Sequence, residues 1–126
     1  MTLVCGKEVQ LPEPNRKAIL TYVRDFLLNQ NKKSIQTEAA DEYNKPICLY
    51  RSEDKTCACA AGSLIPDANY NSNIENHGLH MDCVRSRIPS KYHEYITFIR
   101  ELQMIHDDYK VKDWPEKFNM IEATLT

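Results

Sequence analysis

The residues best suited to chemistry in this chain are thiols and imidazoles gathered between positions 48 and 83. Both groups are preferred ligands of zinc and other soft metals. The members of this set are Cys48, Cys57, Cys59, Cys83, His77 and His80. Structural zinc sites usually take cysteine pairs roughly two to four residues apart in turns. In a straight strand, the Cys57-x-Cys59 pair would instead place its side chains roughly 6.6 Å apart along the chain. We therefore expect buried cysteines, with these six residues as the alternative metal site.

A second chemistry is nucleophilic catalysis by a thiol. Cys59 lies close to Gly62, and His106 and Asp107 supply a base and an orienting carboxylate later in the chain. Such triads are defined by geometry, and the residues around Cys59 match no signature of a thiol enzyme. We therefore assign no catalytic residue and no cofactor. A thiol- or metal-dependent enzyme ranks third among the functions considered.

A third reading is a polar ligand pocket. Arg51 at a strand end, Asp67 after a proline, and the His106-Asp107 pair are the residues that could border it. Two of these residues also have a purely structural interpretation. Asp67 can accept turn amides, and His106, which continues an apolar helical stripe, can point inward and fix the link to the segment of Trp114.

Apolar spacing predicts the elements that must position these residues. Apolar residues recur at steps of three and four from Asn15 to Gln30, and again from Ser90 to about Asp108, which predicts two amphipathic helices. A final helix follows Asp113-Trp-Pro-Glu116, which has the form of a capping box. A short helix is also expected within residues 81–86, and a short helical turn within residues 37–43.

Two short runs, residues 47–51 and 56–60, flank a polar tetrapeptide and predict a β-hairpin. In this register Arg51 opposes Thr56, and alternation places Cys48, Tyr50, Cys57 and Cys59 on one face. Residues 1–13 are read as a lead-in, and residues 69–80 as an exposed loop. The sequence predicts a single α+β domain over residues 1–126, with about three main helices packed on a short antiparallel hairpin.

Composition excludes several classes of protein. The chain carries 16 Lys and Arg against 18 Asp and Glu, a net charge of −2, which is not the basic balance of a general nucleic-acid binder. No segment approaches the ~20 apolar residues of a membrane span, and the N-terminus has no signal-peptide pattern. Five cysteines, an odd number, favour reduced thiols over a disulfide framework. We expect a cytoplasmic protein without membrane partners.

Two segments carry a resemblance. The residues from Cys48 to Arg51 and from Cys57 to Tyr70 follow the pattern C-x-Y-R … C-x-C-A-x-G-x-L-I-P-D-x-x-Y, and Leu102–Asp107 followed by Trp114 reads L-Q-x-x-H-D … W. Together they resemble an uncharacterised family of small bacteriophage and bacterial proteins. Thr56, Ala61 and Ser63 depart from that family, whose members often have glycine or cysteine in this region.

The resemblance implies a context and no activity. A small phage protein of this kind most often modulates a host protein, so we expect a non-enzymatic domain that binds a host protein in the host cytoplasm, as a takeover or counter-defence factor. The exposed loop at residues 69–80 is the natural interface. The alternative is a small-molecule binder, such as a protein that sequesters a nucleotide signal, with Arg51, Asp67, His106 and Asp107 at its pocket.

Overall fold

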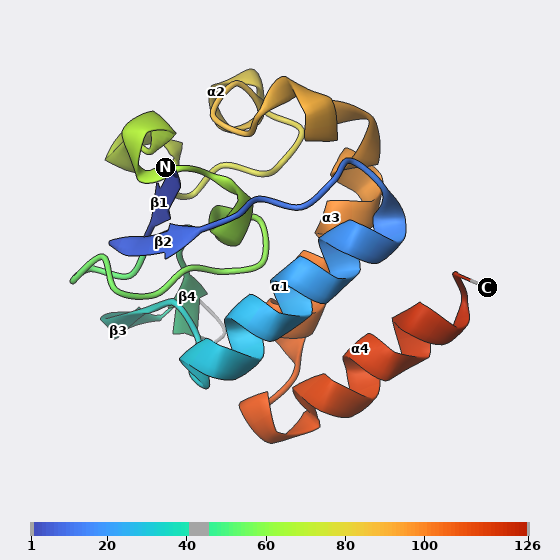
Figure 1. The fold of residues 1–126 in the computed structure, drawn as a ribbon. Coiled ribbons are helices and arrows are strands. Elements are labelled where there is room, and N and C mark those ends of the chain that lie inside the picture. The colour runs from blue at the N-terminus through green and yellow to red at the C-terminus, as the bar shows by residue number, and fades with distance from the viewer. Residues whose placement is uncertain (1, 41–45, 126) are drawn as a thin grey trace.

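The computed structural model describes residues 2–40 and 46–125 and confirms a small α+β domain (Figure 1). Four α-helices are present in the described part of the chain. They are α1 (Arg16–Gln30), α2 (Asp82–Arg85), α3 (Ile96–Asp108) and α4 (Trp114–Ala123). Four strands form two separate antiparallel pairs, β1 (Thr2–Val4) with β2 (Lys7–Val9), and β3 (Ile35–Ala40) with β4 (Pro46–Cys48).

The three longer helices pack against one another and form the centre of the molecule. Helix α1 contacts both α3 and α4, and α3 also contacts α4 (Figure 1). Their facing side chains are fully buried, and they include Ile19, Leu20, Val23 and Leu27 of α1, Ile99 and Leu102 of α3, and Trp114 and Phe118 of α4. Burial of each such side chain contributes about 1.5–3 kcal/mol relative to exposure, so this interface supplies much of the stability.

The predicted helices are present, but one of them starts later than expected and another lacks its expected cap. Asn15 caps α1 through a 2.8 Å bond from the Ala18 N–H to its side chain. The helix expected from Ser90 begins instead as a 3-10 helix over Ser90–Tyr95, and the α-helix starts at Ile96. Asp113 makes no side-chain capping bond at the start of α4, so the predicted capping box is wrong.

The predicted hairpin of residues 47–51 and 56–60 is present only as one antiparallel bridge, and the predicted register is wrong. β4 pairs with β3, with Ile35 opposite Cys48, and Arg51 forms an isolated bridge with Ala58 instead of facing Thr56. The backbone of Ala58 finds its partner elsewhere. The Gln30 side chain accepts from the Ala58 N–H at 2.9 Å and donates to the Ala58 carbonyl at 2.9 Å. A side-chain amide thus takes the place of a strand.

Two further expectations are corrected by the strands. The helical turn expected within residues 37–43 falls partly in β3 and partly on residues 41–45, which lie outside the described residues. The lead-in expected over residues 1–13 contains the β1–β2 hairpin. Its turn is made by Cys5 and Gly6, both with positive φ (54° and 74°), as type I′ hairpin turns require.

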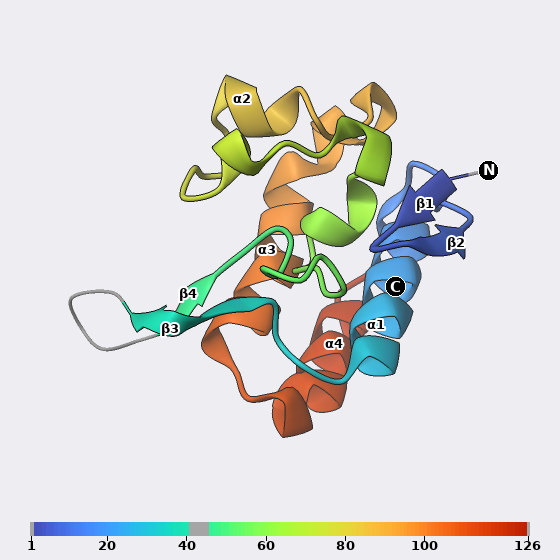
Figure 2. The same ribbon diagram turned by 90° about the vertical axis from the view of Figure 1, so that its left-hand side faces the viewer.

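The central segment between β4 and α2 crosses the helices without regular strands of its own. It turns through three 3-10 helices, Gly62–Leu64, Asp67–Asn69 and Ser72–Ile74. Figure 2 shows this segment beside α3, with β3 and β4 extending away from the helices. Within the predicted exposed loop at residues 69–80, Ile74 and Leu79 are buried. Among the residues described, no helix combines the length and apolar character needed to cross a lipid bilayer.

Candidate functional site

Arg51 is the centre of a buried clamp in the central segment. Its side chain is 2% exposed. The guanidinium donates to the Gly62 carbonyl at 2.6 Å, to the Ile65 carbonyl, and to Asp67 Oδ1 at 3.0 Å. A buried charge is tolerated only when it is paired and hydrogen-bonded, and here those partners all belong to the turn that follows Gly62. Arg51 therefore holds this turn in place.

Asp67 joins the clamp to the N-terminal hairpin. Its two carboxylate oxygens accept from the Cys5 N–H at 2.8 Å and from the Gly6 N–H at 2.9 Å. Partial burial would raise the pKa of Asp67, but the hydrogen bonds from Gly6, Cys5 and Arg51 hold it below its ordinary value. The structural alternative for Asp67 was to accept hydrogen bonds from turn amides. It does so, and these amides belong to the turn between β1 and β2.

His106 is fully buried near the end of α3. Its Nε2 accepts from the Ser34 N–H at 2.9 Å, and this backbone donor fixes the proton on Nδ1, which donates to Asp107 Oδ1 at 2.8 Å. The ring stacks on Trp114, with centroids 5.5 Å apart. The predicted inward position and the link to Trp114 are therefore present. Because both ring nitrogens are occupied, His106 has no lone pair free for a substrate or a metal.

Replacement of His106 by phenylalanine tests this structural role. The aromatic ring would still stack on Trp114, but the buried Ser34 N–H would lose its acceptor, so we expect a loss of about 2 kcal/mol in the free energy of unfolding. Urea denaturation measures it. The matched control is His80→Phe, at an exposed side chain without a hydrogen bond in the described structure, where the change should stay within about 0.5 kcal/mol. Equal effects of the two variants would contradict the assignment.

The four residues expected to share one ligand pocket form two separate pairs. Arg51 pairs with Asp67, and His106 pairs with Asp107. Among the cavities found in the described structure, Arg51 and Asp67 border one, while Asp107 borders another. The expected convergence on a single pocket is absent.

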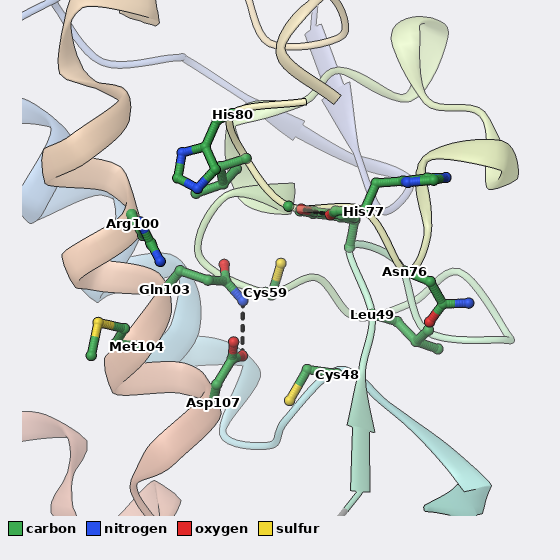
Figure 3. A pocket seen from close by; sticks show the side chains of 13 residues that line it. Cys48, Leu49, Cys59, Asn76, His77, His80, Arg100, Gln103, Met104 and Asp107 are labelled. Atoms are coloured by element: carbon green, nitrogen blue, oxygen red, sulfur yellow. Dashed lines mark hydrogen bonds between the residues drawn. The ribbon is translucent and has the colours of Figure 1, made fainter. Parts of the chain in front are cut away.

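The cavity that Asp107 borders is the best candidate site, and we call it the α3 pocket. It measures about 280 Å³ and lies between α3, the end of β4 with the residues after it, and the segment at residues 76–80 (Figure 3). Its lining residues are Cys48, Leu49, Tyr50, Cys59, Asn76, His77, Gly78, Leu79, His80, Arg100, Gln103, Met104 and Asp107. Four segments far apart in the sequence thus converge on one cavity.

The α3 pocket collects four of the six residues in the alternative metal set. Cys48, Cys59, His77 and His80 line it, whereas Cys57 and Cys83 do not. The predicted common face of Cys48, Tyr50, Cys57 and Cys59 is therefore wrong for Cys57, which borders a different depression.

The geometry does not make these residues a metal centre. In the part of the chain that the structure describes, one group of three ligand atoms lies within 4.8 Å of one another, from Cys48, His106 and Asp107. His106 already uses both nitrogens, so coordination would cost the Ser34 hydrogen bond or the proton shared with Asp107.

The two thiols of the pocket are held in their protonated form. Burial is the largest cause that raises the pKa of Cys59, and the nearby Asp107 carboxylate is the second. The same two causes, in the same order, raise the pKa of Cys48 from 9.0 to about 12. A nucleophilic cysteine needs a lowered pKa, because the thiolate is the reactive form. The pocket therefore lacks an activated thiol, and the Cys59, His106 and Asp107 triad is not assembled for catalysis.

The thiol of Cys48 should consequently react slowly in the folded protein. Three pKa units leave about a thousandfold less thiolate near neutral pH. We expect iodoacetamide to modify Cys48 about a thousandfold more slowly at pH 7.5 in the native state than in urea, with a rate that rises about tenfold per pH unit and levels off only near pH 12. Peptide mass spectrometry reads each cysteine separately, and the partly exposed Cys83 is the internal control. Equal native and unfolded rates at Cys48 would show an accessible thiolate.

Sequence reasoning missed the residues of α3 that complete the site. The Gln103 side chain accepts from the Ala61 N–H at 2.9 Å and donates to Asp107 Oδ1 at 2.8 Å, so it connects the turn after Cys59 to the pocket carboxylate. Arg100, Gln103 and Asp107 follow the i, i+3, i+7 spacing that places side chains on one helical face. This polar spacing is visible in the sequence, but the apolar stripe of the same helix is the stronger pattern. Comparisons with protein-family models, with curated proteins and with solved structures gave no match.

Proposed function

We propose that this protein is a non-catalytic binding protein that holds a small anionic molecule in the α3 pocket. The observation that carries the proposal is a set of donors at the pocket without partners. The side chains of Arg100, His77 and His80 line the cavity, are exposed to solvent and make no hydrogen bond or ion pair within the described residues. Figure 3 shows Arg100 projecting from α3, with His80 on the segment across from it.

Charge and hydrogen-bonding capacity favour an anion at this position. A guanidinium supplies a permanent charge and a fork of donors that suits carboxylate and phosphate groups. Imidazole rings add N–H donors. The neighbouring walls are partly apolar, with Leu79 and Tyr50 buried beneath the rim. A concave site with apolar walls and a few polar groups that can contact a ligand is the usual form of a small-molecule site.

The same geometry supports binding over catalysis. The thiols are protonated, His106 is fixed at both nitrogens, and Asp107 Oδ1 accepts from both Gln103 and His106. These groups stabilise the walls of the pocket, and none of them is poised to move a proton or attack a substrate.

The test is direct identification of a bound anion. Protein purified under mild conditions and then denatured should release a small acidic molecule, detectable by mass spectrometry. Thermal unfolding with inorganic phosphate, acetate and nucleoside monophosphates should show a higher Tm with at least one of them.

Variants locate the effect. Arg100→Gln combined with His80→Gln should weaken that binding at least tenfold, whereas Arg85→Gln, an exposed arginine outside the pocket, should leave it unchanged. Absence of both a released molecule and any anion-induced shift would overturn the proposal.

A second candidate, a host-protein partner, keeps one supporting observation. The predicted interface at residues 69–80 supplies the rim of the pocket, and Met81 and Met104 beside it are about half exposed. Exposed methionines suit adaptable binding surfaces. A phage-type protein acting on a host protein should then retain one partner in stoichiometric amount in a pull-down from expressing cells, and Met104→Lys should release it. Retention that is unchanged by this variant would exclude the rim as the interface.

A further inference from the structure

We propose that the molecule taken by the α3 pocket is an elongated zwitterion, with its acidic group at Arg100 and His80 and an ammonium group at Asp107. This inference rests on the proposed function and specifies its ligand class. It follows from the opposite charges at the two ends of the pocket-facing side of α3 and from the distance between them.

The acceptor end of the pocket is Asp107. Its Oδ1 accepts from Gln103 Nε2 and from His106 Nδ1, both at 2.8 Å. No N–H group of the described residues reaches Oδ2, and the side chain is 33% exposed and lines the cavity. The nearest cation, Lys33, donates to the main-chain carbonyl of Asp107 at 3.2 Å. The Cys48 thiol also donates to the Asp107 carboxylate. Because a thiol is a weak donor, the carboxylate retains acceptor capacity on the pocket side.

Apart from Lys33, whose ammonium group donates to the main-chain carbonyl of Asp107, the pocket residues next to Asp107 add no positive charge. The Cys48 thiol beside it is neutral because its pKa is raised to about 12, and His106 uses Nδ1–H as a neutral ring donor. A half-buried carboxylate with unused acceptor capacity is best satisfied by a charged N–H donor, because charge-assisted hydrogen bonds are about twice as strong as neutral ones. An ammonium group on the ligand meets that requirement.

The donor end lies about two helical turns away. Arg100 and Asp107 are seven residues apart on α3, which is about 10 Å along the helix axis at 1.5 Å per residue. Gln103 lies between them on the same face and is occupied by Ala61 and Asp107. A ligand that satisfies both ends must therefore separate its charges by several ångströms. An extended tripeptide, at about 3.3–3.6 Å per residue, spans about 10 Å between its ends.

Triglycine and its blocked forms are matched probes for this arrangement. Triglycine carries both charges, triglycine amide lacks the carboxylate, N-acetyl-triglycine lacks the ammonium, and glycine has both charges at too short a spacing. Binding to the full chain is followed by ¹⁵N-labelled NMR through the backbone amides of α3. We expect triglycine to bind at least tenfold more tightly than each of the other three.

Two substitutions assign the ends. Asp107→Asn keeps an oxygen that accepts from Gln103 and His106 but replaces Oδ2 by an NH₂ group, so the preference for the free ammonium should fall at least tenfold while the fold is retained. Arg100→Gln, at an exposed side chain, should remove the preference for the free carboxylate. Arg85→Gln, outside the pocket, should change neither preference.

The outcomes separate this inference from the proposed function. Equal affinities for triglycine and its blocked forms, or no binding of triglycine, overturn the zwitterion. If phosphate or acetate still shifts the same α3 amides, anion binding stands without it. If no probe and no simple anion shifts those amides, both proposals fall. Loss of the ammonium preference in Asp107→Asn, with an affinity for N-acetyl-triglycine that is unchanged relative to Arg85→Gln, supports the zwitterion.

Discussion

Gly62→Ala is expected to destabilise the protein by about 3 kcal/mol or more. A Cβ at this position would lie 2.2 Å from the Tyr50 carbonyl oxygen and 3.0 Å from its carbon, both backbone atoms. Tyr50 has little freedom to yield, because its N–H donates to Glu75 at 2.9 Å and the Arg51 N–H donates to the same carboxylate at 3.1 Å. The clash therefore forces the turn away from the clamp.

Urea unfolding of the two variants Gly62→Ala and Gly78→Ala measures this effect against a matched control. A Cβ on Gly78 would have its nearest neighbour at 3.8 Å, in the side chain of His80, which is an ordinary contact. We expect Gly78→Ala to change the free energy of unfolding by less than about 0.5 kcal/mol. If the Gly62 variant unfolds at the same urea concentration as the control, the close approach of the two backbone segments is not present in solution.

Arg51→Met is the second change with a large expected effect. It removes the donors to the Gly62 and Ile65 carbonyls and leaves Asp67 without its buried partner. A buried carbonyl left without its donor costs about 1–3 kcal/mol, and two carbonyls lose a donor here. Asp67 adds less, because its side chain is 36% exposed and solvent screens the charge. Because Arg51 also lies over the ring of Tyr70, at 5.4 Å from its centroid, the loss includes a cation–π contact.

Variants at the same clamp separate charge from geometry. Arg51→Lys keeps the positive charge but cannot reach two carbonyls and a carboxylate at once, so it should recover only part of the loss. Arg85→Met removes an exposed arginine and should have little effect. If Arg51→Met and Arg85→Met unfold alike in urea, the guanidinium is not the centre of this segment.

The helices could be predicted because their signal is local. Apolar residues of α1 and α3 recur with the helical period, and the same residues are buried in the structure, so periodicity locates the part of the core between these helices. Helix ends were less predictable. Ser90 and Asp113 have the chemistry of caps, but neither side chain makes a capping bond, because their segments enter through 3-10 helices.

The strands were not predicted because they are short and carry little alternation of apolar and polar residues, although each pairs with its neighbour in the chain. β4 pairs with β3 across a connection whose sequence is polar and without period. Ala58, in the middle of a run that resembles a strand, is satisfied by the Gln30 side chain from the last residue of α1. The β1–β2 turn escaped notice because cysteine is not a typical residue for positive φ.

The candidate site, too, could be predicted only in part. The inward position of His106 could be predicted from the helical stripe, and its structural alternative is the one observed. The expected pocket of Arg51, Asp67, His106 and Asp107 failed because polar residue types do not reveal which of them are already paired within the fold. Arg100 and His80 belong to the α3 pocket through folding of the segment at residues 76–80 onto α3. The phage-type context stays a prediction.

The attachment of the hairpin turn to Asp67 has a consequence for exchange with solvent deuterium. The Cys5 and Gly6 amides donate to a carboxylate 62 and 61 positions away, and Arg51 fixes that carboxylate. These amide protons exchange only when their hydrogen bonds to Asp67 break. Their rates of deuterium uptake therefore follow opening of the segment that carries Asp67. The exchange rates of these two amides in the β1–β2 turn therefore report on opening of the segment around Asp67.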